Sequence, residues 1–301
     1  MSEMKFEHQS YIAHVKNYDD MGSALERIEN DTSIDYWRHE QMYKTLTPLL
    51  DKDKLWLTIG DGIGTDANWL LKQGMKVKAS DIADTILKMS EAKGYIDGFF
   101  KENAEYLSFK DESLEYVLCK EAYHHFPRPY IALYEMIRVA SKAVVLIEPN
   151  DIGIQWPFII AIKNVLDRFN TGLINSIWKN RHSFETVGNY VYKISEREME
   201  KVAMGINLPV IAFKGFNDYF SANLDLGQPH ATSKKIFNFV KSKIARKNFL
   251  CNIGLVPFEL ITTIIFKQTP SEKTLAELKR SGYKIVKLKR NPYLNTGNIG
   301  A

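Results

Sequence analysis

Residues 57–71 read LTIGDGIGTDANWLL: an apolar run, three alternate glycines and a helix-forming stretch. Glycine has no Cβ atom, so Gly60, Gly62 and Gly64 permit a sharp turn and a close approach of backbone N–H groups to a ligand. A tight turn without a ligand is the alternative, but three alternate glycines at the end of one strand favour ligand binding. The stretch therefore predicts the first strand, loop and helix of a ligand-binding α/β sheet.

Short apolar runs and amphipathic stretches alternate along much of the chain, as they do in proteins built on a parallel sheet. Helices are expected around residues 65–73, 83–93, 129–140, 195–205, 233–246 and 271–282. Strands are expected at residues 55–59, 75–80, 98–100, 114–119, 142–148, 259–267 and 283–289. The predicted fold class is α/β, with a Rossmann-like, mostly parallel sheet of seven strands and helices on both faces.

The same alternation predicts how the chain is organised. It indicates a helical N-terminal segment at residues 1–50. The core is expected in three pieces, at residues 51–150, 195–215 and 258–301. Two aromatic-rich insertions are expected between them, at residues 151–194 and 216–257. The two insertions lack a strand pattern, and we expect them to form a cap over the substrate pocket.

The composition narrows the class of protein. Of 301 residues, 45% are hydrophobic and 25% charged, which is typical of a globular chain, and the net charge of +4 does not favour nucleic acid as the main partner. Cys119 and Cys251 are the two cysteines, which excludes a disulfide framework and suits a cytoplasmic protein. Pro257 and Glu259 interrupt the longest apolar stretch, 249–266, so stable membrane insertion is not expected.

The glycine loop departs from the dinucleotide-binding fingerprint, because Thr65 stands where that fingerprint has its last glycine. Asp81 follows the second strand about 20 residues after the loop, where a carboxylate can accept from both ribose hydroxyls. With the helical segment before the first strand and the stretch 102–129, ENAEYLSFKDESLEYVLCKEAYHHFPRP, these features resemble class I S-adenosylmethionine-dependent methyltransferases. The resemblance covers residues 54–150 well and the remainder weakly.

The resemblance implies S-adenosylmethionine as the cofactor and assigns it a set of binding residues. The implied set is Gly60, Asp61, Gly62, Gly64, Asp81, Ile82, Asn103, Ala104, Lys120 and Glu121, and Arg38 or Tyr36 from the N-terminal segment could close over the cofactor. Asp81 would hold the ribose, Ile82 would pack on the adenine and Asn103 would accept from the adenine amino group. Two positions depart from the family pattern: Thr58 and Asn103 stand where the family usually has acidic residues.

Three residues are candidates for catalysis. His124 and His125 follow the fourth strand and Asp151 follows the fifth, all at the edge where α/β sheets hold ligands. Imidazole has a pKa suited to removing a hydroxyl proton, and a tandem His with a nearby acid resembles small-molecule and sugar O-methyltransferases. One histidine is expected to act as the base and Asp151 to orient a ring or hold the acceptor. The histidines show no metal-binding spacing, so no metal is expected.

The leading interpretation is a methyltransferase whose acceptor is a small molecule, such as a saccharide or a related metabolite. A nucleic-acid acceptor is not expected, because no base-flipping motif follows the fourth strand. An NAD-dependent oxidoreductase and a non-catalytic binding protein of the same fold are the alternatives. The basic segment 233–247 could attract an anionic acceptor or rest on an anionic membrane, and a solvated face is its simplest interpretation. Whether the chain forms a homodimer stays open.

Overall fold

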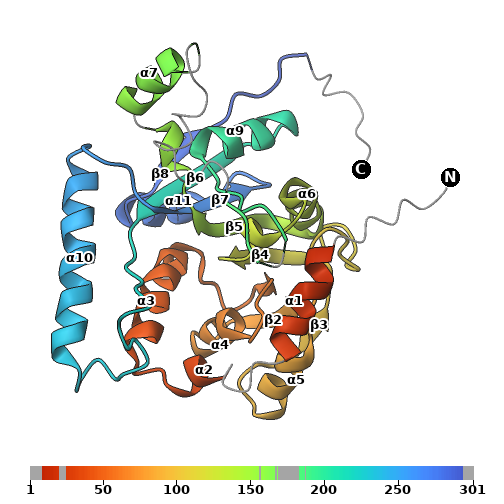
Figure 1. The fold of residues 1–301 in the computed structure, drawn as a ribbon. Helices are drawn as coiled ribbons and strands as arrows, with labels where there is room; N and C mark the ends of the chain where they lie inside the picture. The colour runs from red at the N-terminus through yellow and green to blue at the C-terminus, as the bar shows by residue number, and fades with distance from the viewer. Residues whose placement is uncertain are drawn as a thin grey trace.

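The computed structural model describes residues 9–19, 25–155, 157–166, 168, 183–186 and 188–293 (Figure 1). Within them, one sheet of eight strands has the order β3-β2-β1-β4-β5-β7-β6-β8. The strands are β1 Leu55–Ile59, β2 Lys76–Asp81, β3 Phe99–Lys101, β4 Leu114–Lys120, β5 Ala140–Pro149, β6 Val210–Phe216, β7 Leu260–Phe266 and β8 Lys284–Lys287. The first five strands pair in parallel, and β7 runs antiparallel to β5 and β6.

The prediction of seven strands was wrong by one. Each expected strand is present, but β6 (VIAFKGF) was not recognised, and it lies between β7 and β8. Gly215 interrupts its apolar pattern, and a Cβ atom there would lie 2.4 Å from the ring of Phe258. The glycine that makes the stretch look irregular is therefore the residue that lets Phe258 pack on it.

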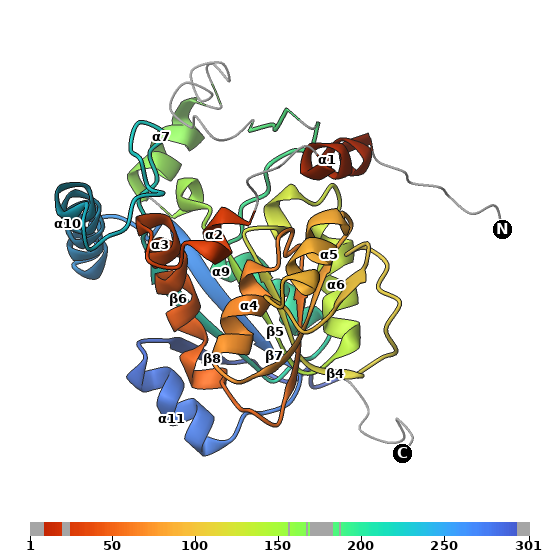
Figure 2. The same ribbon diagram turned by 90° about the horizontal axis from the view of Figure 1, so that it is seen from below.

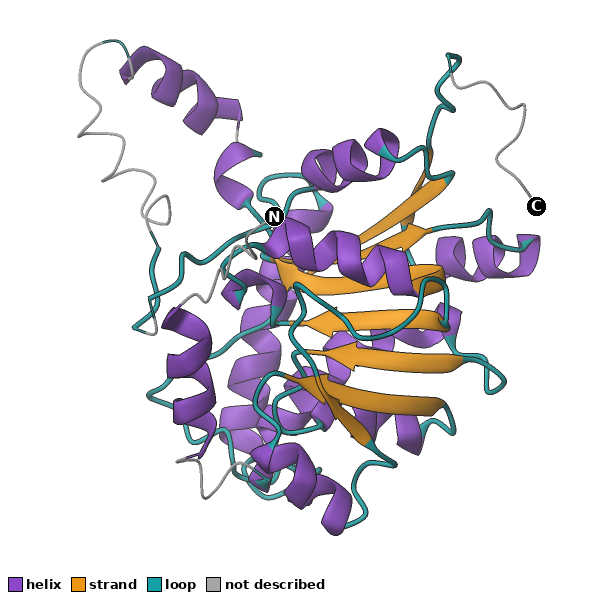
Figure 3. Ribbon diagram, turned by 90° about the vertical axis from the view of Figure 1, so that its right-hand side faces the viewer, coloured by secondary structure: helices purple, strands orange, loops and turns teal. Residues whose placement is uncertain are grey.

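Helices cover both faces of the sheet (Figures 2 and 3). The described α-helices are α1 Gln9–Asp19, α2 Glu26–Glu29, α3 Ile34–Tyr43, α4 Thr65–Lys72, α5 Thr85–Ala92, α6 Pro129–Val139, α7 Pro157–Leu166, α9 Glu196–Gly205, α10 Lys234–Asn252 and α11 Glu272–Arg280. One apolar layer joins the sheet to α3, α4 and α11, and a second joins it to α6 and α9. This confirms the mostly parallel α/β architecture. No described helix has the length and apolar character to cross a membrane.

The second insertion packs against the N-terminal segment. The backbone N–H groups of Ile34 and Asp35 donate to the carbonyls of Gln228 and Leu226, at 3.0 and 2.9 Å. In Figure 1, α10 stands at the edge of the molecule beside α3. Residues 167 and 169–182 of the first insertion lie outside the described residues, and the joint cap stays a prediction.

Candidate functional site

The glycine loop has the backbone that only glycine adopts readily. Gly60, Gly62 and Gly64 have φ angles of +69°, +46° and +83°. A Cβ atom on Gly60 would lie 2.5 Å from the Cβ atom of Ala122, which follows β4. The loop therefore packs against the end of the neighbouring strand β4, and a side chain at position 60 would not fit there.

Asp61 holds the loop against the start of α4. Its buried carboxylate accepts from the backbone N–H groups of Asp66 and Ala67, each at 2.9 Å, and from the Thr58 hydroxyl at 2.8 Å. Burial raises the pKa of Asp61 well above its usual value, and the nearby Asp66 adds to that effect. Thr58 thus stands in the family's acidic position as a donor to Asp61, and the Asp61 side chain orders the loop.

Asp81 ends β2 beside the loop. Its two carboxylate oxygens accept from the N–H groups of Gly62 and Ala83, both at 2.8 Å. Burial raises the pKa of Asp81, and the hydrogen bonds from the backbone oppose that shift. A carboxylate has about four sites that accept hydrogen bonds, more than the backbone donors use, so Asp81 can hold the loop and accept from a ribose at the same time.

Two cavities meet at this edge of the sheet. A narrow one of about 90 Å³ is lined by Asp81, Ile82, Ala104, Phe126 and, from α1, Tyr11 and His14. A broad one of about 1240 Å³ is lined by residues of α2, α3, the segment after β6, and α10. Gly60, Glu121 and His125 line both cavities. The shared residues mark the junction at which a group could pass from a ligand in one cavity to a ligand in the other.

The cofactor residues assigned from sequence fall unevenly around the narrow cavity. Ile82 and Ala104 line it, as does Glu102, which sequence analysis missed. Asn103 turns its side-chain oxygen to the backbone N–H of Glu105, at 2.9 Å. The oxygen expected to meet an adenine amino group is thus already an acceptor within its own turn.

Lys120 is held inside an ionic network at the end of β4. Its ammonium lies 3.2 Å from a carboxylate oxygen of Asp66 and 3.2 Å from His39 Nδ1, and it faces the Tyr43 ring at 5.2 Å. Burial works to lower the pKa of Lys120, but Asp66 and Glu121 outweigh it and raise that pKa. Lys120 therefore stays charged, and it lines the broad cavity beside the start of α4.

Arg38 connects α3 to the segment after β6. Its Nε atom donates to Asp218 at 2.9 Å, a second nitrogen donates to the same carboxylate, and Nη1 donates to Asp35 at 2.8 Å. The guanidinium also lies over the Phe220 ring, 5.2 Å from its centroid. Arg38 lines the broad cavity, so its predicted contact with the cofactor stays a prediction.

His124 is oriented by a carboxylate that sequence analysis missed. Its Nδ1 atom lies 2.6 Å from an oxygen of Glu148, a fully buried residue of β5. The other oxygen of Glu148 accepts from the N–H groups of Ala122 and Tyr123, each at 2.9 Å. Burial favours the neutral ring, but Glu148 outweighs it, so the pKa of His124 is raised. His124 thus has a fixed ring and a raised basicity.

His125 has its own carboxylate partner. Its Nδ1 atom lies 2.8 Å from Glu185, and its ring centroid lies 3.9 Å from that of His124. Burial and the neighbouring His124 lower the pKa of His125. Ligand atoms of His124, His125 and Glu185 all lie within 4.8 Å of one another, a grouping that could hold a metal ion. The spacing of the histidines did not indicate it, because Glu185 comes from the first insertion.

Asp151 lies beyond the end of β5. Its backbone N–H donates to the carbonyl of Ile194 at 2.8 Å, and burial raises the pKa of its half-buried carboxyl group, with Lys193 opposing that shift. Asp151 is not among the described residues that line the two cavities. Glu148 occupies the position beside the imidazole that was expected for Asp151.

Comparison with known proteins gives one match in sequence and several in fold. Residues 57–147 match the family model described as "Methyltransferase domain". No curated protein matches the chain. Those residues hold the glycine loop, Asp81, both histidines and all but the last two residues of β5.

Several solved structures resemble the chain at low identity. An S-adenosylmethionine-dependent methyltransferase from Archaeoglobus fulgidus has 15% identity and a TM-score of 0.49, over 78% of this chain and 95% of its own. A possible histamine N-methyltransferase from Thermotoga maritima has 12% identity and a TM-score of 0.47, over 87% of this chain and 100% of its own. Magnesium protoporphyrin IX methyltransferase from Synechocystis, solved with S-adenosylhomocysteine, has 14% identity and a TM-score of 0.42, over 76% of this chain and 83% of its own. The family match over residues 57–147, with the glycine loop and Asp81 within it, supports an S-adenosylmethionine-dependent methyltransferase, and S-adenosylmethionine is the cofactor.

Proposed function

We propose that this chain transfers the methyl group of S-adenosylmethionine to a hydroxyl group of a small polar acceptor such as a saccharide. The observation that carries the proposal is the buried Glu148, which orients His124 beside the junction of the two cavities. In the reaction, a bond forms between the acceptor oxygen and the methyl carbon while the carbon–sulfur bond breaks. The hydroxyl proton passes to His124, and S-adenosylhomocysteine and a methyl ether are the products.

The narrow cavity would hold the adenosine end of the cofactor. Asp81 would accept from the ribose hydroxyls, and Ile82 and Ala104 would pack against the adenine. Gly60 and Glu121, which line both cavities, would then lie beside the sulfonium. The bound cofactor supplies an electrophilic methyl group, and the protein's part is to align it with the acceptor.

The imidazole of His124 would act through Nε2, since Nδ1 faces Glu148. A neutral imidazole with Nδ1–H donated to a carboxylate leaves Nε2 as the proton acceptor. The carboxylate also stabilises the imidazolium that forms when the proton arrives.

The broad cavity suits a polyhydroxylated acceptor. Charged side chains of both signs line it, including the ion pairs Arg27–Asp35 and Lys247–Glu259 and the carboxylates of Glu121 and Asp218. Such a wall offers acceptors and donors to hydroxyl groups, and the aromatic side chains of Tyr219 and Phe220 offer apolar surface to the face of a sugar ring.

The test has two stages. Calorimetric titration with S-adenosylmethionine, S-adenosylhomocysteine and NAD comes first, and we expect binding of the two adenosyl compounds alone. Turnover of labelled S-adenosylmethionine against a panel of saccharides follows, with His124→Ala and a matched control, His230→Ala. We expect His124→Ala to lower kcat at least 100-fold with little change in cofactor affinity, and His230→Ala to change neither. Full turnover in His124→Ala would overturn the assignment of the base.

A further inference from the structure

One helix of this chain carries basic side chains and no acidic ones. Residues 229–258 hold six Lys and Arg and no Asp or Glu, whereas the whole chain holds 40 basic and 36 acidic residues. All six basic residues belong to α10. Residues 279–290 hold six more basic residues without an acidic one, so the chain has two basic segments, and α10 is the one that lies on a single long helix.

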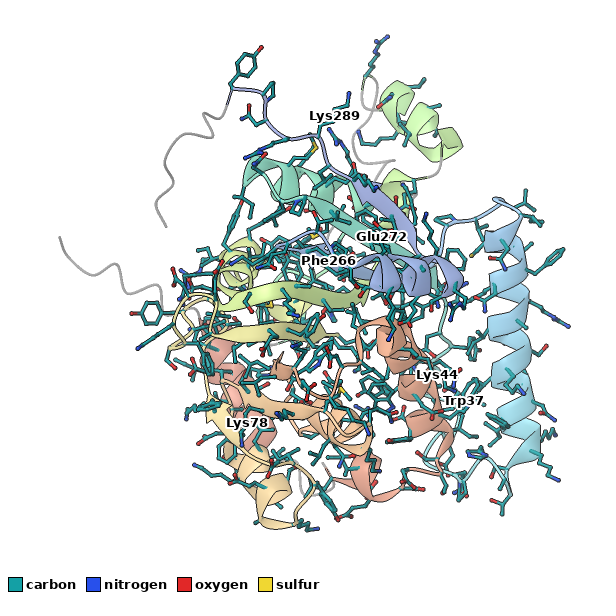
Figure 4. All side chains as sticks on the ribbon, turned by 180° about the vertical axis from the view of Figure 1, so that it is seen from behind. Trp37, Lys44, Lys78, Phe266, Glu272 and Lys289 are labelled. Carbon is teal, nitrogen blue, oxygen red and sulfur yellow. The ribbon has the colours of Figure 1, made fainter. Side chains whose placement is uncertain are left out.

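The inner face of α10 is occupied by packing within the protein. Val240 is fully buried against Ile34 and Leu226, and Phe237 meets the Trp37 ring edge-on at a centroid distance of 5.0 Å. Figure 4 shows Trp37 on the α3 side of α10. This contact fixes which side of α10 faces outward.

The outer face combines cations with exposed apolar side chains. Among the described residues, the ion pair that α10 forms is the one between Lys247 and Glu259, at 2.5 Å. Exposed apolar side chains lie among the cations and beyond them: Phe239 is 43% exposed within α10, and Phe249 at 62%, Ile253 at 53% and Leu255 at 63% lie at and past its C-terminal end. A face that existed for solubility alone would not also expose two phenylalanines and two aliphatic side chains.

We propose that the outer face of α10 and the turn that follows it dock on an anionic lipid surface. Lys and Arg are attracted to acidic headgroups, and Phe, Ile and Leu side chains enter the boundary between headgroups and acyl chains. The exposed Ile253 and Leu255 favour a lipid over a nucleic acid, since a phosphate backbone offers aliphatic side chains nothing. α7, which lies on the side toward which the C-terminal end of α10 points (Figure 1), adds the exposed Ile162 and Val165.

Docking through α10 places the broad cavity beside the lipid. Lys247 of α10 lines that cavity, together with Tyr219 and Phe220 from the segment before α10 and with Leu260 just after the turn. An acceptor carried on a lipid headgroup would therefore reach the cavity without leaving the membrane surface. The docking itself depends on α10 and the turn that follows it, and it does not require the proposed methyl transfer.

The experiment measures co-sedimentation of the full chain with vesicles, in the absence of cofactor. Vesicles of phosphatidylcholine with 30% phosphatidylglycerol are compared with phosphatidylcholine alone, at low and high salt. Each basic residue near an acidic bilayer raises partitioning roughly fivefold, so Lys241→Glu with Arg246→Glu should lower it at least about 25-fold. The matched control reverses two exposed charges of α11, Lys279→Glu with Arg280→Glu, and should lower partitioning much less.

The contribution of the exposed apolar side chains to docking is tested by the double variant Phe249→Ser with Ile253→Ser. We expect a several-fold loss of partitioning that high salt does not mask, since the buried apolar area is not screened. Circular dichroism checks that each variant is folded. Equal sedimentation with both kinds of vesicle, or an α11 variant that loses as much as the α10 variant, would overturn the proposal. So would salt-sensitive binding to single-stranded DNA without binding to vesicles, which would identify the surface as one for nucleic acid.

Discussion

The Nδ1 atom of His124 lies 2.6 Å from Glu148, and Glu148 also accepts two backbone N–H bonds from Ala122 and Tyr123. One fully buried carboxylate thus fixes both the ring and the loop that carries it. A buried carboxylate without donors would be costly. The two backbone N–H groups and the imidazole together therefore allow Glu148 to be buried. Removal of the charge should therefore affect the basicity of His124 before it affects the fold.

Glu148→Gln should move the pH profile. His124 acts as a base only when neutral, so activity rises as pH increases through its pKa, which Glu148 holds above the ordinary value. An amide cannot hold that pKa up, so the acidic limb of kcat/KM should shift to lower pH while kcat falls about 10- to 100-fold. The pH–rate profile is the measurement, and a lower rate with an unmoved limb would mean that Glu148 only supports the fold. Glu185→Gln, which removes the partner of His125, should shift the limb less.

Asp81→Asn should weaken cofactor binding. The asparagine keeps the shape but loses the charge that favours hydrogen bonds from ribose hydroxyls, so we expect affinity for S-adenosylhomocysteine to fall about 10- to 100-fold. Calorimetry measures it directly. The control is Asp84→Asn, a nearby acid that pairs with Lys88 and Lys101. Equal losses in the two variants would show a general charge effect and remove the ribose assignment.

Gly60→Ala should destabilise the fold by about 3 kcal/mol, since it adds a left-handed alanine and a contact of 2.5 Å with the Ala122 Cβ atom. Gly205→Ala is the matched control, because nothing lies within 4 Å of a Cβ atom there. It should be neutral or slightly stabilising. Urea unfolding gives both free energies, and similar values for the two variants would contradict the left-handed, tightly packed conformation of Gly60.

Zinc should inhibit the enzyme. Ligand atoms of His124, His125 and Glu185 lie within 4.8 Å of one another, and imidazole and carboxylate both bind Zn²⁺. A metal on His124 would occupy the nitrogen needed for the proton, so activity should fall with added Zn²⁺ and return with EDTA. Glu185→Gln should weaken the inhibition. Activation by Zn²⁺ would instead make the trio a functional metal site and contradict the role of His124 as a free base.

Local chemistry explains which parts of the molecule could be predicted. The glycine loop, the expected strands and the helix expected at residues 195–205, which begins where Ser195 accepts from the Glu198 N–H at 3.3 Å, depend on neighbours in sequence. β6 was not recognised, because Gly215 interrupts its apolar pattern. The presence of that glycine is explained by its contact with Phe258, which comes from a distant part of the chain.

The candidate site likewise contains residues that the local sequence indicates and residues that it does not. His124, Asp81 and the loop glycines follow strands, and their positions at the sheet edge come from the fold class. Glu148 did carry a signal, an acidic residue at the end of an apolar strand, but the expectation fell on Asp151 because ligands are held beyond the carboxyl ends of the strands and Glu148 lies within β5. Glu185 meets His125 across 60 positions, which no local pattern indicates.

The helix α1 also affects how fast the enzyme can work. Its Tyr11 and His14 line a cavity of about 90 Å³, well below the roughly 300–1,000 Å³ of ordinary small-molecule sites. In the proposed mode of binding, an adenosyl group would need more room than this, and an outward movement of α1 would supply it. We therefore expect the residence time of S-adenosylhomocysteine, rather than the chemical step, to limit turnover, and a chain that begins after α1 to exchange its cofactor faster and hold it less tightly.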